Sequence, residues 1–256
     1  GTVYPIFLDV ISSQKISVGP PFYHKLIIPF LIPFLVMMAI GPKLKWIKSQ
    51  LEDKIYLVSF FIISILLAFL VLKNFNQNVL INTILISSAL YLFFLTLRDF
   101  FVKKYKNISQ NIAHFGFSLL ILSILFNNLF ATEIITNLKV GETFENSKTK
   151  IVFESVDQKK EQNYNAIIAN FFISHQNGEE DRLSPELRIY NQPVIATSEA
   201  DIKTTLMSDK FIVINLVQNQ DFFNVRYQVK PFMLWIWLSV ILISFGGIVS
   251  FLQKRS

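Results

Sequence analysis

Long apolar runs constrain this chain of 256 residues more than any other feature of its sequence. A run of about 18 apolar residues is long enough to cross the hydrocarbon core of a bilayer as a helix. The hydrophobic fraction of 52% and the positive mean hydropathy of +0.45 are too high for an ordinary soluble domain. We therefore predict a multi-span α-helical membrane protein. The predicted spans cover residues 25–42, 55–72, 79–97, 110–131 and 231–252.

Charge is sorted along the chain in a way that predicts topology. Residues 132–228 carry fourteen acidic and ten basic side chains, net −4, and the remainder carries four acidic and fourteen basic, net +10. Basic residues fill the loops after the first, third and last predicted spans, which share one side if the helices alternate. By the positive-inside rule this side is the cytoplasm, or the matrix of a mitochondrion. The residues are Lys43, Lys45, Lys48 and Lys54, then Arg98, Lys103, Lys104 and Lys106, then Lys254 and Arg255.

This topology places residues 1–24 and 132–228 on the extracytoplasmic side and leaves residues 253–256 as a cytoplasmic tail. The membrane is then a bacterial inner membrane or a mitochondrial inner membrane. A nucleic-acid partner would need a basic stripe on a soluble face, so none is expected. The start at Gly1, without a signal-peptide pattern, predicts that the numbering begins inside a longer protein or just past the end of an earlier helix.

Residues 132–228 are predicted to form an inserted extracytoplasmic, mainly β domain, because short alternating apolar runs replace helical periodicity. Asn177-Gly178 is a turn signal, and residues 218–221 are expected to close a hairpin between the last two runs. Pro231 is expected in the first turn of the last span. The predicted strands cover residues 150–156, 166–174, 186–190, 211–217 and 223–229.

Few residues could carry chemistry. The chain has no cysteine, which excludes disulfides, thiolate metal sites and cysteine nucleophiles. Paired carboxylates, Ser-His-Asp sets and phosphate-binding loops are also absent, so no catalytic residue is predicted.

His114 is the candidate binding residue, because it is the only histidine inside a predicted span. An ionisable side chain in hydrocarbon is costly unless it faces a partner or a cavity. Gln110, Asn111 and Ser118 share its helical face, and Ala113 and Gly116 allow close approach of a helix or a flat cofactor. The imidazole could bind haem iron, relay protons, or only tie two helices by a hydrogen bond. The other histidines fit less well: His24 reads as a surface residue and His175 as part of a solvated turn.

Several segments, in order and along essentially the whole chain, resemble the C-terminal part of the CcmF/CycK family of cytochrome c-type biogenesis (haem lyase) proteins. Residues 111–116, Asn-Ile-Ala-His-Phe-Gly, resemble the transmembrane histidine helix of that family. Residues 227–232, Tyr-Gln-Val-Lys-Pro-Phe, with Trp235 and Trp237 after them, resemble its final strand-to-helix junction. The remaining matches are residues 1–5, 16–22, 41–42, 186–191 and 246–247.

The resemblance implies a function in cytochrome c maturation. Proteins of this family form the membrane haem lyase, which takes haem from a periplasmic haem chaperone and attaches it covalently to apocytochrome c. They also hold a transmembrane b-type haem, for which His114 would be one axial ligand to the iron. The other ligands, and the residues that hold the transient haem substrate, would lie in an N-terminal half that precedes Gly1. Expected partners are that half, the haem-loaded chaperone, apocytochrome c with its thiol-handling subunits, and the lipid bilayer.

Two other classes of function stay open on the residues alone. A transporter or channel subunit would show paired broken helices and several intramembrane charges. The sequence shows neither, although Pro29 and Pro33 do interrupt the first span. A membrane-anchored assembly scaffold would use the β domain for docking and need no cofactor. By itself the chain is expected to be inactive as a haem lyase.

Overall fold

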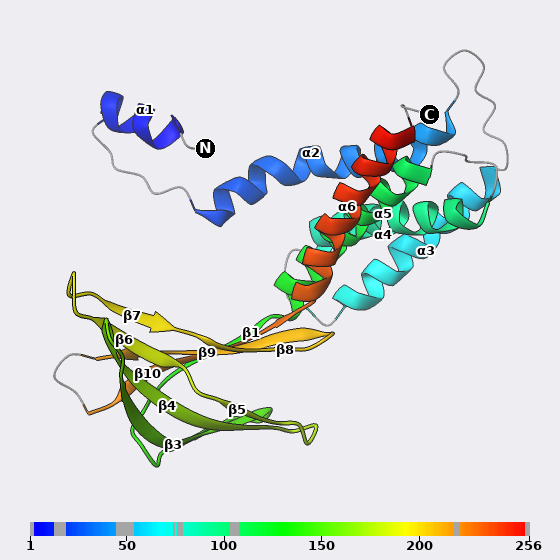
Figure 1. Cartoon of the computed structure of the whole chain (residues 1–256). Coiled ribbons are helices and arrows are strands. Elements are labelled where there is room, and N and C mark those ends of the chain that lie inside the picture. Colours follow the sequence, from blue (N-terminus) through cyan, green and yellow to red (C-terminus); the bar gives the residue numbers. More distant parts are fainter. Residues whose placement is uncertain are drawn as a thin grey trace. The chain divides into compact units, whose positions relative to one another are not determined.

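The computed structural model describes residues 3–12, 19–44, 54–73, 75, 79–102, 108–217 and 221–253 (Figure 1). These residues divide into two compact units. The first, here called the helical unit, comprises Gly1–Leu125 and Trp237–Ser256. The second, the β unit, comprises Phe126–Ile236. Lys45, Lys48, Lys103, Lys104, Lys106, Lys254 and Arg255, on which much of the topology prediction rests, lie outside the described residues.

The helices include five that are long and apolar enough to cross a membrane, so the chain is a multi-pass membrane protein. The first apolar segment, Lys25–Lys43, covers most of α2 and the short 3-10 turn that follows it at Gly41–Lys43. Helix α1 stands in a segment for which the sequence predicted no helix. The bounds are α1 Val3–Ser12, α2 Pro20–Ile40, α3 Lys54–Leu72, α4 Val79–Phe101, α5 Ile108–Phe130 and α6 Met233–Gln253.

Helix α2 continues through Pro29 and Pro33 instead of breaking there. Proline removes one intrahelical hydrogen bond, and neighbouring helices can compensate for that loss in a membrane protein. The ring of Phe34, next to Pro33, packs edge-on against Phe117 of α5 with centroids 5.8 Å apart. Packing against another helix therefore accompanies the two prolines, and they give no evidence for a broken transport helix.

Helix α4 is the most enclosed of the spans, with 50% of its apolar window buried against 11% for α2 and α6. It packs against both α2 and α3. The Tyr91 ring of α4 meets Phe61 of α3 edge-on at 5.7 Å, and Phe60 stacks with Phe94 at 6.1 Å. The outward side chains of the remaining spans are apolar and exposed, which is the pattern of helices that face lipid or another apolar chain.

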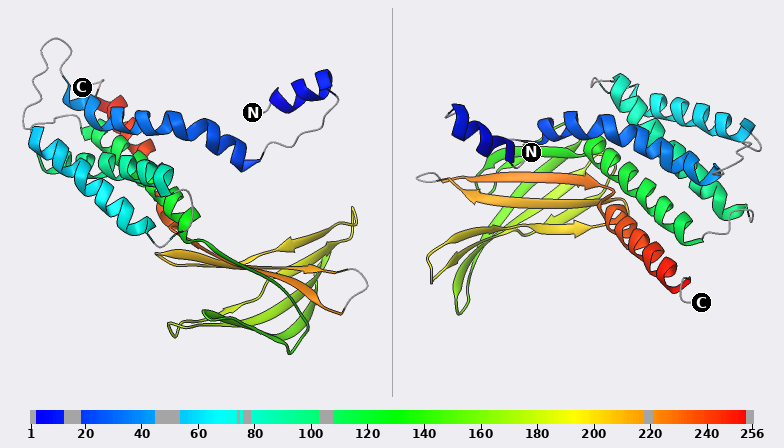
Figure 2. Two further views of the ribbon diagram at one scale, coloured as in Figure 1. Left: turned by 180° about the vertical axis from the view of Figure 1, so that it is seen from behind. Right: turned by 90° about the horizontal axis from the view of Figure 1, so that it is seen from above.

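The β unit is a two-layer sandwich of antiparallel strands, and Figure 2 shows its two sheets as separate layers. One sheet has the order β1-β10-β9-β8, and the other has the order β2-β3-β4-β6-β7 with β5 paired to β4. The bounds are β1 Thr132–Leu138, β2 Thr143–Glu145, β3 Thr149–Lys160, β4 Tyr164–His175, β5 Glu180–Leu183, β6 Glu186–Tyr190, β7 Ala196–Glu199, β8 Asp201–Thr204, β9 Ser208–Leu216 and β10 Phe223–Pro231.

The core of the β unit lies between the sheets. Phe153 and Phe171 stack with ring centroids 4.5 Å apart, and neither side chain is more than 1% exposed. Alternate residues of β9 and β10 complete the layer from the other sheet, among them Ile212, Ile214 and Val225. This one-face burial explains why the sequence alternates at period two in these segments.

The predicted strands all correspond to observed ones, and β9 pairs with β10 antiparallel as a hairpin, as expected. Gly178 has a φ of +83° in the turn between β4 and β5, a conformation that glycine adopts without strain. Strands β1, β2, β5, β7 and β8 were not predicted. Most of them are short edge or next-to-edge strands with mixed exposure, so their sequences carry little alternation.

The strand-to-helix junction differs from the sequence prediction. Pro231 is the last residue of β10, paired with Ser208, and α6 begins two residues later at Met233. Between them Phe232 takes a left-handed φ of +62°, which is unusual for a bulky residue. The Pro231 carbonyl accepts a 2.6 Å hydrogen bond from Asn127 of α5, which keeps the proline in the strand. The side-chain amide of Asn127 thus connects the two segments through which the chain enters and leaves the β sandwich, namely the end of α5 and the end of β10.

Candidate functional site

His114 lies in α5, six residues after the helix begins at Ile108. Its side chain is half-buried, whereas Asn111 and Ser118 on the same helical face are buried. The flanking side chains are engaged with other helices: Phe115 packs against Phe93 of α4 at 5.2 Å. The helix that carries His114 is therefore packed against α4 next to this residue.

The small residues near His114 serve helix packing. A Cβ atom added at Gly246 of α6 would lie 2.8 Å from the backbone nitrogen of Ala113. One added at Gly116 would lie 3.0 Å from both the backbone nitrogen and the Cγ1 atom of Ile243. These contacts show that α6 occupies the Ala113–Gly116 face of α5. Successive helical residues are ~100° apart, so His114 projects away from that contact.

The imidazole of His114 makes no hydrogen bond within the described part of the chain. The Ser118 hydroxyl, by contrast, donates to the carbonyl of Phe115 in its own helix at 2.8 Å. An interhelical hydrogen bond, the simplest structural explanation of a membrane histidine, is thus not formed among these residues. A half-buried imidazole with both nitrogens uncommitted fits an axial ligand of haem iron.

A second axial histidine does not come from the described spanning segments. His24 precedes the apolar segment of α2, which begins at Lys25; the prediction about its exposure concerns a side chain outside the described part. His175 lies in the β unit. Among the described residues there is also no group of three or more His, Cys, Asp and Glu that could hold a metal ion. A haem with two histidine ligands would need a residue from elsewhere.

A buried ion pair between the ends of two spanning helices was missed by sequence reasoning. Lys43 Nζ lies 2.7 Å from Asp99 Oδ2, and the two side chains are 3% and 5% exposed. Arg98 stacks over the ring of Tyr56 with its Cζ atom 3.6 Å from the centroid. Both basic residues were expected in loops, but Lys43 lies in the 3-10 turn after α2 and Arg98 lies in the last turns of α4, which continues to Phe101. Asp99 is the only acidic residue in the described spanning segments, and this could have indicated from the sequence that it pairs with a basic residue.

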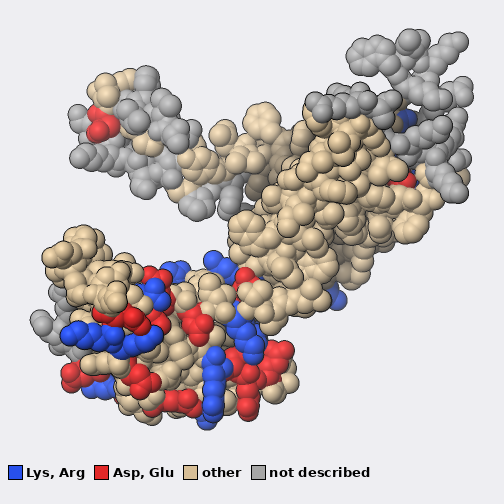
Figure 3. All heavy atoms as spheres, viewed as in Figure 1, with Lys and Arg blue, Asp and Glu red and all other residues tan. Residues whose placement is uncertain are grey.

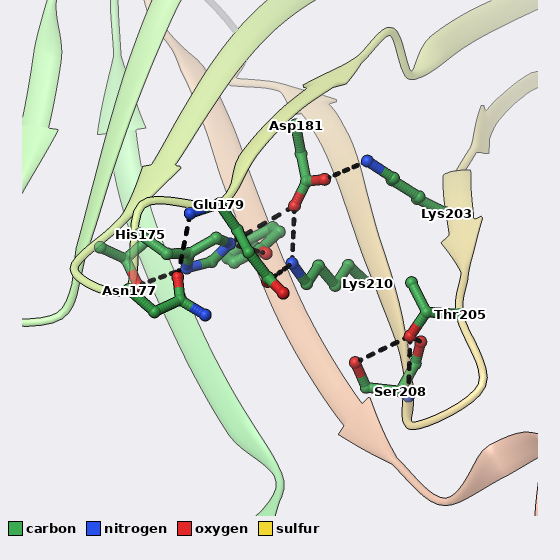
Figure 4. Close-up of polar contacts among 10 residues, drawn as sticks. His175, Asn177, Glu179, Asp181, Lys203, Thr205, Ser208 and Lys210 are labelled. Carbon is green, nitrogen blue, oxygen red and sulfur yellow. Dashed lines mark hydrogen bonds and ion pairs between the residues drawn. The ribbon is translucent and has the colours of Figure 1, made fainter.

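The sequence predicted that His175 is part of a solvated turn, and the structure shows that this prediction is wrong. His175 ends β4, its side chain is 14% exposed, and its Nε2 atom lies 3.2 Å from the hydroxyl of Tyr227 and 3.4 Å from Asp181 Oδ2 (Figure 4). Lys203 donates to Asp181 Oδ1 at 2.5 Å and Lys210 donates to Oδ2 at 2.9 Å. We call His175, Asp181, Lys203, Lys210 and Tyr227 the polar cluster. It joins β4 and β5 of one sheet to β8, β9 and β10 of the other.

The electrostatics of the polar cluster favour fixed charges. Burial alone would raise the pKa of Asp181, but hydrogen bonds from Lys203 and Lys210 outweigh it and hold that pKa below its usual value. Burial and the nearby Lys210 ammonium lower the pKa of His175, so its ring stays neutral near pH 7. Burial raises the pKa of Tyr227. These groups form no activated nucleophile, and the cluster fits a cross-link between the two sheets.

The comparisons with known proteins agree with the resemblance. Residues 129–231 match the family model described as the CcmF C-terminal beta-sandwich. The whole chain is similar to the cytochrome c-type biogenesis protein CcmF of Pseudomonas fluorescens, with 26% identity over 272 residues and 41% of that protein covered. It is also similar to CcmF of Haemophilus influenzae, at 26% with 42% covered, and of Escherichia coli, at 22% with 41% covered.

A solved structure shows the same fold. The chain aligned with "Cytochrome c Heme Lyase CcmF" gives a TM-score of 0.73 at 19% identity, covering 97% of this chain and 41% of that one. The chain thus spans about two fifths of the length of these relatives. Its resemblance to the C-terminal part of the CcmF/CycK family is confirmed over its whole length.

Proposed function

We propose that this chain works in cytochrome c maturation as the C-terminal part of a membrane haem lyase, with His114 as one axial ligand of a transmembrane b-type haem. The carrying observation is His114 itself: a half-buried membrane imidazole without a hydrogen bond among the described residues, in a chain similar to CcmF along its whole length. When bound, such a haem would pass one electron to an incoming ferric haem iron, and a donor outside this chain would have to reduce it again.

The residues of this chain would contribute binding and orientation. Contacts with α2, α4 and α6 fix the rotation of α5, so the ring nitrogen of His114 is presented at a constant place. The remaining haem ligands and the site of the transferred haem would belong to the upstream half. Thioether formation requires two large partners to be held in register, which needs positioning more than an acid–base pair. The haem chaperone and apocytochrome c with its thiol-handling subunits would be these partners.

The proposed topology places the β unit on the extracytoplasmic side of a bacterial or mitochondrial inner membrane. The Lys43–Asp99 ion pair supports it, because it joins the ends of α2 and α4 and thereby puts the first two basic loops on one side. Reporter fusions after Asn146 and after Lys104 should report opposite compartments. The same compartment for both would reject this orientation.

The function is tested by His114→Ala in the complex formed by co-expression with the upstream half. We expect loss of the b-haem spectrum and of holocytochrome c, with the protein still inserted, because alanine is well tolerated in a span. Added imidazole should restore part of the spectrum. The chain expressed alone should bind little low-spin haem.

Gln110→Ala provides the matched control, since Gln110 lies one helical turn before His114 and is also half-buried. It should leave both readouts intact. If His114→Ala keeps an unaltered low-spin spectrum and a normal cytochrome yield, the ligand assignment is wrong. If the spectrum is lost but cytochrome c is still made, His114 is a haem ligand, but this haem is not needed for cytochrome c maturation.

A further inference from the structure

The turn between β8 and β9 presents two large apolar side chains. Leu206 is 60% exposed and Met207 is 58% exposed. Two hydrogen bonds close the turn: Thr205 donates from its backbone nitrogen to the Ser208 carbonyl at 2.9 Å and from its hydroxyl to the same oxygen at 2.7 Å. Figure 4 shows Thr205 and Ser208 closing it. Tight turns normally carry small or polar residues, so two adjacent apolar ones point to an apolar partner.

The backbone of the same turn is bound to the beginning of α6. The Leu206 carbonyl accepts a 3.0 Å hydrogen bond from the indole nitrogen of Trp235. The Met207 carbonyl accepts a 2.8 Å hydrogen bond from the backbone nitrogen of Phe232, the residue with the left-handed φ. The Phe232 ring also packs against Phe126 at 5.7 Å. The carbonyls of Leu206 and Met207 therefore both accept hydrogen bonds from residues at the start of α6, while their side chains stay exposed on the surface of the β unit.

Trp235 indicates the depth of this contact in the membrane. It is the third residue of a spanning helix, where an indole characteristically lies at the boundary between headgroups and acyl chains. A carbonyl within hydrogen-bond distance of that indole lies at the same depth. The exposed side chains of Leu206 and Met207, which belong to this turn, are then at the depth where the acyl chains of the bilayer begin.

We propose that the Thr205–Ser208 turn is a membrane-insertion element, with Leu206 and Met207 immersed in the lipid interface beside the start of α6. The occupant is lipid, because the turn is continuous through two hydrogen bonds with a helix that already lies in lipid. The turn adds a third attachment of the β unit to the bilayer, besides the two chain crossings. The assignment does not depend on haem or on the function proposed above.

The test uses the absence of cysteine from the chain. Leu206→Cys and Met207→Cys are made singly in the full chain, labelled with an environment-sensitive nitrobenzoxadiazole dye, and reconstituted in phosphatidylcholine vesicles. We expect blue-shifted emission and strong quenching by lipids that carry a nitroxide near the headgroup.

Val140→Cys is the matched control. Val140 is 52% exposed and also lies in a tight turn, closed by the 3.0 Å bond from Glu142 nitrogen to the Lys139 carbonyl. That turn follows the end of β1, a whole strand away from α5. Its label should emit as in water and resist the lipid quenchers.

A second measurement avoids substitution. Met207 is the only methionine within residues 132–228, and in the unmodified chain its oxidation by hydrogen peroxide should be several-fold slower in vesicles than that of free methionine. Labels at positions 206 and 207 as wet as that at 140, with Met207 oxidised at the free rate, would overturn the proposal. Protection that arises only after the upstream half is added would also overturn it, since the turn would then be a protein contact.

Discussion

The helical unit and the β unit stabilise their folds in different ways. On the face drawn in Figure 3, charged side chains are spread over the β unit, whereas few appear among the described residues of the helical unit. The β unit buries a dense apolar core between its sheets, with Ile151, Ile173 and Ile212 fully enclosed. The spans α2 and α6 bury only 11% of their apolar windows. In water that exposure would be unstable, whereas in a bilayer the lipid solvates it.

Specificity also differs between the two units. In the β unit, directional hydrogen bonds between side chains of the polar cluster fix the sheets against each other. In the helical unit, close backbone approach at Gly116 and Gly246 fixes α5 against α6. Because lipid is as apolar as leucine, apolar burial gives helices little preference for one another, and shape complementarity must supply it. The following predictions test this contrast.

The largest effect is expected from Asp181→Ala in the polar cluster. The change removes the buried partner of Lys210, which is 8% exposed, and leaves it only the exposed carboxylate of Glu179, so we expect a loss of about 3 kcal/mol in unfolding free energy. Asp99→Ala should cost less, because the long stem of Lys43 at a helix end can carry its ammonium towards water. Thermal unfolding of the full chain in detergent, followed by near-ultraviolet circular dichroism, measures both.

Glu180→Ala is the control for this comparison, since Glu180 adjoins Asp181 on β5 and is exposed. It should leave the transition nearly unchanged. An equal shift for Glu180→Ala and Asp181→Ala would show that the polar cluster does not stabilise the sandwich.

An intermediate effect is expected from Gly246→Ala in α6. The new methyl group would meet the backbone nitrogen of Ala113 at 2.8 Å, and backbone cannot move aside as a side chain can. Overpacking of this kind costs about 1–3 kcal/mol. Gly247→Ala is the neighbouring control, since its Cβ meets nothing within 4 Å. Equal melting temperatures for the two variants would contradict close packing of α5 on α6.

The smallest effect is a pH dependence of the β unit. The pKa of His175 is lowered in the folded state, so the unfolded chain binds the proton more readily. Stability is therefore retained above the unfolded pKa of about 6.5 and falls as the pH drops from there towards the folded pKa. His175→Gln should remove this loss of stability. It should not change the separate loss at lower pH, where Asp181 becomes protonated. Melting temperatures between pH 7.5 and 4.5 give both curves; an unchanged slope in the variant would exclude His175 as the cause.

The candidate site was predictable only in part. His114 stood out because a histidine in an apolar span is rare, and that signal is local in the sequence. The Lys43–Asp99 pair joins residues 56 positions apart, and the polar cluster gathers residues from five strands. Neither has a local pattern. His175 was misjudged because Asn177 and Gly178, which follow it, form a turn signal, whereas its own exposure depends on contact with a strand of the other sheet.

The sequence by itself determined the membrane spans, the inserted β domain and the family resemblance, because length, apolar content and period-two alternation are properties of neighbouring residues. The tertiary structure alone decided which side chains are paired. It placed α6 on the small face of α5, leaving His114 on another, and it bound the Leu206–Met207 turn to Trp235. Such pairings depend on contacts between distant segments, and these exist only once the chain has folded.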